Sequence, residues 1–201
     1  MHRVEKRAKT RARLIEAALN VFAFGGYEHA TVDDIAHAAG LSKGAFYFNF
    51  NSKEEILIEL LRQWADERAS ALSTAAQAAA ESTARFPSMA AALIAYGGGT
   101  NWPPLILEFW SQALRAGAVD RVLKQAYRDF RTALAGAAAE TANGRDAGQT
   151  ADAILAVHDG AVTEIALGRA RSSAGAAPGL AAMVAGAAMG SGEAAVRAAG
   201  A

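Results

Sequence analysis

The sequence predicts an all-α fold of about nine helices. Apolar residues recur at three- and four-residue intervals along most of the chain, which is the period of an amphipathic helix, and glycine or proline separates the periodic segments. The 201 residues are 52% hydrophobic, enough to form a sizeable core. We expect a small N-terminal domain of three helices (residues 1–52) followed by a larger helical domain (residues 53–201).

Charge is unevenly distributed along the chain, although the formal net charge is zero. Residues 1–53 hold eight Lys or Arg and five Asp or Glu, a net charge of +3, so the rest of the chain carries −3. Six basic residues crowd the first thirteen positions, against the single acidic Glu5: Arg3, Lys6, Arg7, Lys9, Arg11 and Arg13. This composition is typical of a segment that meets a polyanion, and a solvated terminus is the alternative.

The first predicted helix covers Thr10 to Phe24 and ends at Gly25 and Gly26. Its apolar stripe consists of Ile15, Ala18, Leu19 and Phe22. Two short helices follow, joined by a tight turn. Thr31 and Asp34 have the spacing of a capping box for the first of them, Gly40 can take the left-handed conformation that ends it, and Ser42 can cap the next. The residues expected inside this helix-turn-helix are Ile35, Ala36, Leu41 and Phe46.

The third helix has the side chains of a helix that enters the major groove of DNA. Gly44 and Ala45 are small enough for close approach to the groove floor. Ser42 and Lys43 offer a hydroxyl and a cation to bases or to phosphates, and Tyr47 can donate to a phosphate oxygen.

The segment after this helix adds a phosphate site. Ser52 and Glu55 have capping-box spacing, so exposed amides at the start of a fourth helix lie beside Lys53. Asn49 can also donate to phosphate. The aromatic residues of the region are expected to pack rather than to stack on bases: Phe46, Phe48 and Phe50.

Three runs of residues, Thr31 to Ala36, Ala39 to Tyr47 and Phe50 to Glu54, resemble the TetR family of bacterial transcriptional regulators. The resemblance covers roughly residues 10 to 60. It implies a homodimer whose N-terminal helices bind a palindromic operator in double-stranded DNA. It also implies that a small molecule binds the larger domain and releases the DNA.

Carried over by position, the resemblance implies DNA contacts at a set of residues in and around the helix-turn-helix. These are Thr31, Ser42, Lys43, Gly44, Ala45, Tyr47, Asn49 and Lys53. Asn49 departs from the commonest pattern, since many members have a histidine there. The basic segment, with Arg7 and Arg11, resembles the extensions that some members lay into the minor groove.

A long helix from Lys53 to about Ala80 is expected to join the two domains and to act as a lever. The remaining helices are expected after Phe86–Ser88, then over 101–116, 119–140, 149–169 and 180–199. The helix expected over 119–140 has a stripe that we expect to be buried: Val119, Leu123, Ala126, Phe130, Leu134 and Ala137.

An effector site is expected among the middle helices, because aromatic residues are concentrated there with few polar groups. The candidates are Trp64, Tyr96, Trp102, Glu108, Phe109, Trp110, Gln112, Tyr127, Phe130, Arg131 and His158, with Asp159 and Glu164 as further polar groups. Taken singly, each is also compatible with core or surface. Acidic residues outnumber basic ones in this set, which favours a cationic or neutral ligand of unknown identity.

The last two predicted helices are rich in small residues, which favours a four-helix homodimer interface with two helices from each subunit. The candidate interface residues are Ile154, Val157, Ala161, Ile165, Leu180, Met183, Val184 and Ala187. Ordinary packing within one chain is the alternative.

We expect no enzyme activity, metal or cofactor, because no nucleophile is paired with a base and no ligand spacing suggests a metal site. The alternative to a DNA-binding repressor is a helical regulator that senses ligands or partner proteins without small-molecule induction. The uncharged run from Ser172 to Gly192 contains Pro178 and is too weakly apolar for a membrane span. Without cysteine or a secretion signal, a cytoplasmic protein is expected.

Overall fold

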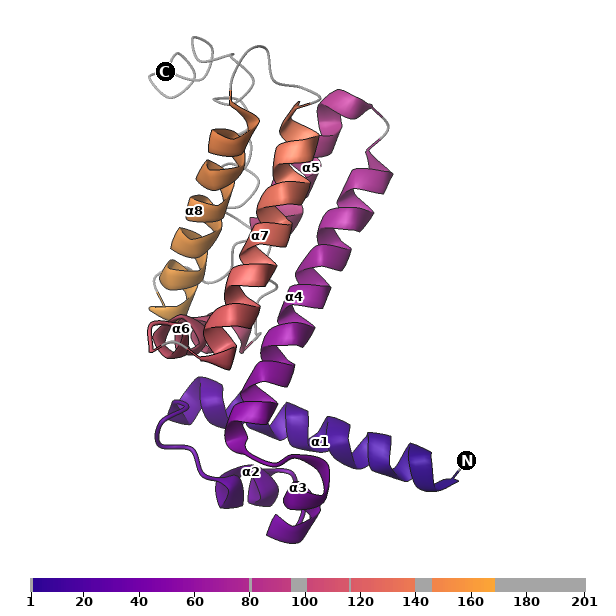
Figure 1. Ribbon diagram of the computed structural model, residues 1–201, viewed down its shortest axis with the longest axis vertical. Helices are drawn as coiled ribbons and strands as arrows, with labels where there is room; N and C mark the ends of the chain where they lie inside the picture. The colour runs from indigo at the N-terminus through magenta and orange to yellow at the C-terminus, as the bar shows by residue number, and fades with distance from the viewer. Residues whose placement is uncertain (1, 80, 95–100, 116, 140–145, 169–201) are drawn as a thin grey trace. The chain divides into compact units, whose positions relative to one another are not determined.

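The computed structural model describes residues 2–79, 81–94, 101–115, 117–139 and 146–168. These residues form eight α-helices and no strand (Figure 1). The helices are α1 (His2–Gly25), α2 (Val32–Ala38), α3 (Lys43–Asn49), α4 (Lys53–Ala78), α5 (Ser82–Ile94), α6 (Trp102–Ala113), α7 (Ala118–Ala139) and α8 (Ala147–Ala166). The all-α prediction is confirmed, and the expected ninth helix over 180–199 lies outside the described residues.

The chain forms two compact units. The first contains Met1–Ala65 and Asn101–Lys124, and the second contains Asp66–Thr100 and Gln125–Ala201. The first unit therefore holds α1, α2, α3 and α6, and both α4 and α7 contribute to the two units. The division into functional domains at residue 52 stays a prediction.

The first unit is built around α1, which packs on α2, α3 and α6. Its stripe residues Ile15, Ala18 and Phe22 are buried, as the periodicity predicts. The helix-turn-helix residues Ile35, Ala36 and Phe46 are also buried. The start of α4 and the whole of α6 add further buried side chains to this unit: Ile56, Leu57, Leu60, Leu61, Trp64, Leu105, Ile106 and Phe109.

Two glycines make the turns of this unit possible. Gly26, after α1, has a φ of 75°, and Gly40, after α2, has a φ of 63°. After α2 the amide of Gly40 donates to the His37 carbonyl and the amide of Leu41 donates to the Ala36 carbonyl. This bond pattern is the Schellman motif, which satisfies carbonyls at the helix end and confirms the predicted role of Gly40.

In the second unit, α5 packs on α8. The stripe expected over residues 119–140 is buried along α7, part of it in each unit. In α8 the buried residues are Ala151, Ile154, Leu155, His158 and Val162. Their spacing of three or four residues gives α8 one buried face.

Two helix limits differ from the sequence expectations. The first helix begins at His2 instead of Thr10, because the basic segment has good helix formers and no breaker. The helix expected after Ser88 begins at Ser82 and includes Pro87.

Within the described residues, no helix has both the length and the apolar character needed to cross a membrane.

Candidate nucleic-acid interface

Thr31 and Asp34 cap α2 reciprocally. The Thr31 hydroxyl accepts from the Asp34 amide (3.1 Å), and the Asp34 carboxylate accepts from the Thr31 amide (2.9 Å) and from its hydroxyl (2.6 Å). These hydrogen bonds from Thr31 lower the pKa of Asp34. The capping box is therefore confirmed, and the hydroxyl proton of Thr31, a residue expected to contact DNA, is held by Asp34.

The start of α3 presents an open polar surface. Ser42, Lys43, Gly44 and Tyr47 are exposed, and Ala45 is half-buried. Ser42 is the N-cap: its Oγ accepts from the Ala45 amide (3.2 Å), which leaves the hydroxyl proton available to a ligand. Four of the expected contact residues therefore lie open on one short helix and its cap.

Lys43 forms an ion pair with a carboxylate of α2. Its Nζ lies 2.7 Å from Oδ2 of Asp33 in α2. Asp33 raises the pKa of Lys43, through a hydrogen bond and through its charge. Both side chains are exposed, so this pair joins the starts of α2 and α3 at the surface.

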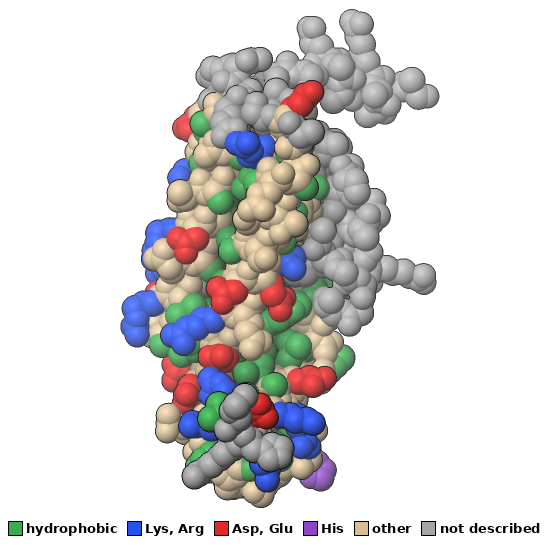
Figure 2. All heavy atoms as spheres, turned by 90° about the vertical axis from the view of Figure 1, so that its right-hand side faces the viewer, with side chains coloured by type: hydrophobic (Ala, Val, Ile, Leu, Met, Phe, Trp, Pro, Cys, Tyr) green, Lys and Arg blue, Asp and Glu red, His purple; other side chains and the backbone are tan. Residues whose placement is uncertain are grey.

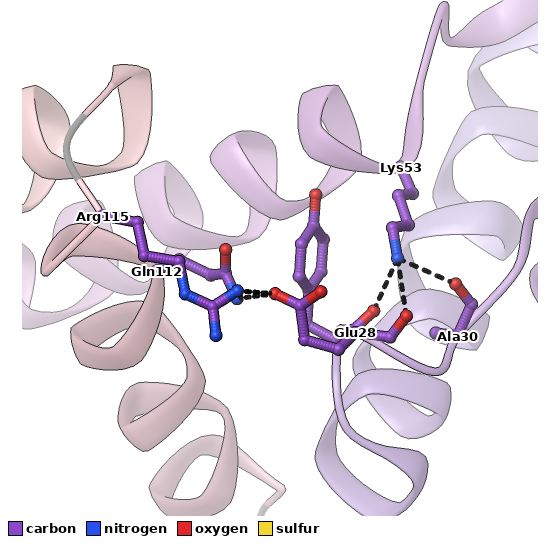
Figure 3. A network of polar contacts seen from close by, with 6 residues as sticks. Glu28, Ala30, Lys53, Gln112 and Arg115 are labelled. Atoms are coloured by element: carbon purple, nitrogen blue, oxygen red, sulfur yellow. Dashed lines mark hydrogen bonds and ion pairs between the residues drawn. The ribbon is translucent and has the colours of Figure 1, made fainter.

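Lys53, expected at a phosphate, is used inside the fold instead. Its Nζ donates to the carbonyls of Tyr27 (2.8 Å), Glu28 (3.1 Å) and Ala30 (3.1 Å), and it lies 4.4 Å from the centre of the Tyr27 ring (Figure 3). The three donors of an ammonium are thereby taken up by the loop between α1 and α2. Lys53 ties the start of α4 to that loop.

Glu28 joins the same loop, between α1 and α2, to α6. The Glu28 carboxylate accepts from Gln112 (2.9 Å) and forms an ion pair with Arg115 (Figure 3). The hydrogen bond from Gln112 and the charge of Arg115 lower the pKa of Glu28. Tyr27 is buried next to it, and this burial, together with the charges of Glu54 and Glu28, raises the pKa of Tyr27 to about 12.

The basic segment is part of α1, so Arg7 and Arg11 lie on a helix, and their expected contact with the minor groove stays a prediction. Arg11 donates to the Asn49 carbonyl (2.9 Å), pairs with Glu59 (3.2 Å) and covers the Phe50 ring at 4.0 Å. Arg7, one turn earlier, is exposed. Figure 2 looks onto the face where this end of α1 lies, with Lys and Arg side chains around it.

Two residues at the end of α3 differ from expectation. Asn49, predicted to donate to phosphate, is 7% exposed, and its Nδ2 donates to the Ala45 carbonyl (2.8 Å) while its Oδ1 has no hydrogen-bond partner. Phe48, predicted to be packed, is 63% exposed, with the Arg7 guanidinium 5.3 Å from its ring centre. The predicted burial of Phe46 and Phe50 is confirmed.

The effector candidates fall into both units. Trp64, Trp102, Glu108, Phe109, Trp110 and Gln112 belong to the first unit, Tyr127, Phe130, Arg131 and His158 belong to the second, and Tyr96 lies outside the described residues. Gln112 is bound to Glu28, and Arg131 forms a surface ion pair with Asp152 (2.6 Å).

In the second unit, Asp159 joins two effector candidates. Its Oδ1 accepts from the Tyr127 hydroxyl (2.6 Å) and lies 2.9 Å from Nδ1 of His158, which is buried. This arrangement combines a half-exposed carboxylate with two rings. Among the described residues, no three carboxylate or imidazole side chains are grouped so that they could hold a metal ion.

The expected dimer residues of α8 divide into two groups. Ile154 is fully buried within the single chain, so it belongs to the core and its assignment to an interface is wrong. Val157, Ala161 and Ile165 are half-buried. Leu180, Met183, Val184 and Ala187 lie outside the described residues.

Two family descriptions match the chain in succession. "Bacterial regulatory proteins, tetR family" matches residues 14–60, which span the helix-turn-helix, and "BetI-type transcriptional repressor, C-terminal" matches residues 102–186. The chain belongs to the TetR family. The first match contains residues 31–54, on which the sequence analysis based the resemblance. The second match extends the similarity to the C-terminal half of the chain.

Curated relatives resemble this TetR family chain over the helix-turn-helix segment. The HTH-type transcriptional regulator SrpR of Pseudomonas putida is 49% identical over 53 residues, which are 26% of this chain and 25% of the relative. The HTH-type transcriptional repressor KstR2 of Rhodococcus jostii is 42% identical over 57 residues, 28% of each chain. The matches thus span about a quarter of these relatives, which are named as regulators and not as enzymes.

Solved structures share the fold over most of the TetR family chain. A TetR transcription regulator from Haloarcula marismortui superposes with a TM-score of 0.78 at 19% identity, covering 90% of this chain and 98% of its own. A putative regulator from Saccharomonospora viridis in complex with choline superposes with a TM-score of 0.75 at 20% identity. The superposition covers 88% of this chain and 94% of the regulator. FadR from Bacillus subtilis in complex with stearoyl-CoA superposes with a TM-score of 0.73 at 18% identity. The superposition covers 87% of this chain and 97% of FadR.

Proposed function

We propose that this TetR family chain is a repressor that binds a palindromic DNA operator as a homodimer and is released by a small molecule. The observation that carries the proposal is the open start of α3. There Ser42, Lys43 and Tyr47 present polar groups beside Gly44, where even an added Cβ would meet only the Ser42 hydroxyl at 3.8 Å. A helix with so little bulk at its start fits the major groove.

The surroundings of α3 favour DNA over a neutral partner. Lys6, Arg7 and Lys9 are exposed on the first turns of α1, and Arg7 extends over Phe48 of α3. Exposed cations beside a groove-sized helix can contact phosphates and fix the register of the helix. The cations that are held inside the fold, Arg11 and Lys53, leave these three as the phosphate contacts of our proposal.

A dimer would repeat this surface about a two-fold axis, which requires a palindromic operator with half-sites about one turn of DNA, or a multiple, apart. The half-buried face of Val157, Ala161 and Ile165 on α8 supports the proposed interface, because its apolar surface is only partly covered within one chain. In the proposed dimer this face packs against the same face of the partner subunit.

A small-molecule effector is supported by the complexes of the neighbours with choline and stearoyl-CoA. In this chain the Tyr127, His158 and Asp159 cluster provides a carboxylate flanked by rings, which suits a cationic group. We place the polar end of the effector there.

Release requires that effector binding alter the helix-turn-helix. The loop between α1 and α2 is held by Lys53 at the start of α4 and by Gln112 and Arg115 at the end of α6. A shift of either helix would pull on the loop that precedes α2. The proposed signal therefore reaches the DNA-binding helices through this loop.

The test is a fluorescence-anisotropy titration of the full chain against duplex from its own promoter region and against an unrelated duplex, at several salt concentrations. We expect tight, selective binding that weakens steeply as salt rises. Equal, weak binding to the two duplexes and no motif from a random-sequence selection would reject the DNA-binding function. Ligand release is then tested by adding choline and other quaternary amines, with Asp159→Asn as the variant expected to lose the response.

A further inference from the structure

An exposed lysine and an exposed aspartate lie side by side at the start of the two DNA-reading helices. Lys43 Nζ and Asp33 Oδ2 are 2.7 Å apart, and the side chains are 54% and 63% exposed. The capping of α2 does not use Asp33, because Thr31 and Asp34 form the capping box. Asp33 is therefore available to hold Lys43, and the two form one surface group with a cationic and an anionic half.

This group is poorly suited to a phosphate. A phosphate oxygen within hydrogen-bond distance of the Lys43 ammonium would also lie within a few ångströms of the Asp33 carboxylate, and like charges at that distance repel. A neutral ligand that offers both an acceptor and a donor does not meet this repulsion.

The major-groove edge of a G·C base pair is such a ligand. Guanine presents two acceptors, O6 and N7, and cytosine presents the N4 amino donor next to them. Lys43 keeps two N–H donors after its bond to Asp33, and Asp33 keeps its second carboxylate oxygen, Oδ1, which accepts no hydrogen bond from the described residues.

We infer that the Lys43–Asp33 pair reads one G·C base pair in each half-site of the operator. Lys43 donates to O6 or N7 of guanine, and Asp33 accepts from N4 of cytosine. This inference rests on the proposed function, which it deepens by naming a base pair and by making Asp33 a specificity residue. The ion pair also orients Lys43 before DNA arrives.

The experiment is a selection from random-sequence duplex with the full chain and three variants: Lys43→Ala, Asp33→Ala and Asp120→Ala. Asp120 is the matched control because it also pairs with a lysine, Lys124, and its removal changes the net charge equally. In the wild-type motif and in the control we expect a G·C preference of about 5- to 150-fold at one position of each half-site. Lys43→Ala and Asp33→Ala should lower that preference toward one at the same position.

A fourth variant, Lys43→Gln, gives a positive result that misfolding cannot imitate. Glutamine pairs with adenine, but the Asp33 carboxylate would then face the O4 acceptor of thymine, so this variant is combined with Asp33→Asn, and the pair of substitutions should change the preferred base pair at that position from G·C to A·T. In addition, Asp33→Ala should raise affinity for unrelated duplex and steepen its salt dependence by about one phosphate contact, because Lys43 is then free to meet a phosphate.

Three outcomes would overturn the inference. Lys43→Ala could weaken binding to all DNA sequences equally and reduce the salt dependence of binding, which is the behaviour of a phosphate contact. The two alanine variants could relax different positions, or Asp33→Ala could leave the motif unchanged. If the wild-type chain selects no motif at all, the proposed function itself fails, and that result is distinct from these three.

Discussion

The ammonium of Lys53 lies 2.8 Å from the carbonyl oxygen of Tyr27, a residue twenty-six positions earlier in the chain. Through this bond and those to Glu28 and Ala30, the first residue of α4 closes the turn that precedes α2. A side chain expected at the DNA surface is thus a structural tie within the first compact unit.

Replacing Lys53 by methionine should destabilise the chain. The aliphatic stem stays, but three carbonyls lose a charged donor, and hydrogen bonds to charged groups contribute about 1.5–3 kcal/mol. Urea unfolding followed by circular dichroism measures the change. Lys124→Met, at an exposed i,i+4 pair, should change the free energy of unfolding by no more than about 0.5 kcal/mol. Equal effects of the two variants would contradict the role given to Lys53.

Arg7 and Arg11 should separate into a DNA contact and a structural residue. Arg7→Ala should weaken DNA binding and reduce its salt slope by about one while leaving the melting temperature unchanged, because Arg7 is exposed. Arg11→Ala should lower the melting temperature, because Arg11 bonds to Asn49 and Glu59. Thermal melts and salt titrations of DNA binding by both variants test this separation. A lower melting temperature for Arg7→Ala and an unchanged one for Arg11→Ala would refute the assignment.

Asn49→Leu should leave stability unchanged or raise it. The Asn49 side chain is almost fully buried with Oδ1 unpaired, and replacing a half-satisfied buried amide by an apolar group of similar size removes that desolvation cost. Operator affinity should stay within about twofold of wild type, because a buried side chain does not reach phosphate. A loss of affinity in a variant with unchanged melting would restore Asn49 as a DNA contact.

Asp34 should make the stability of the chain depend on pH in the acid range. Its pKa is lower in the folded chain, so its stabilising effect is fully present above the ordinary carboxyl pKa of about 3.9 and is lost as pH falls through the folded value. Asp34→Asn should therefore melt below wild type at pH 7, with a difference that shrinks toward pH 2. Asp66→Asn, at an exposed carboxylate of α4, is the control, and a difference that is constant with pH would exclude this linkage.

The sequence predicted the helix-turn-helix closely because each signal there is local. Thr31, Gly40 and Ser42 act on backbone groups within five residues of themselves, so their spacing is enough to assign their roles. The stripe of α7 was predicted correctly for the same reason, since helical periodicity alone determines which residues share a face.

The partners of charged side chains could not be predicted in this way. Lys53, Arg11 and Asn49 have residue types that suit phosphate, and only the tertiary arrangement brings carbonyls and rings within their reach. The pairing of Asp33 with Lys43 joins residues ten positions apart on two helices, and the ties of Glu28 cross more than eighty positions. No periodicity or motif carries such information.

The inclusion of α6 in the same compact unit as the helix-turn-helix limits how the gene can be recombined. A chimera that takes residues 1–52 from this chain and the rest from a relative would separate α1 from the α6 on which it packs. The contacts of Asn20 with Asn101 and of Glu28 with Gln112 would then depend on residues of another protein. Exchange of DNA specificity between such regulators should succeed when residues 101–124 travel with the N-terminal segment.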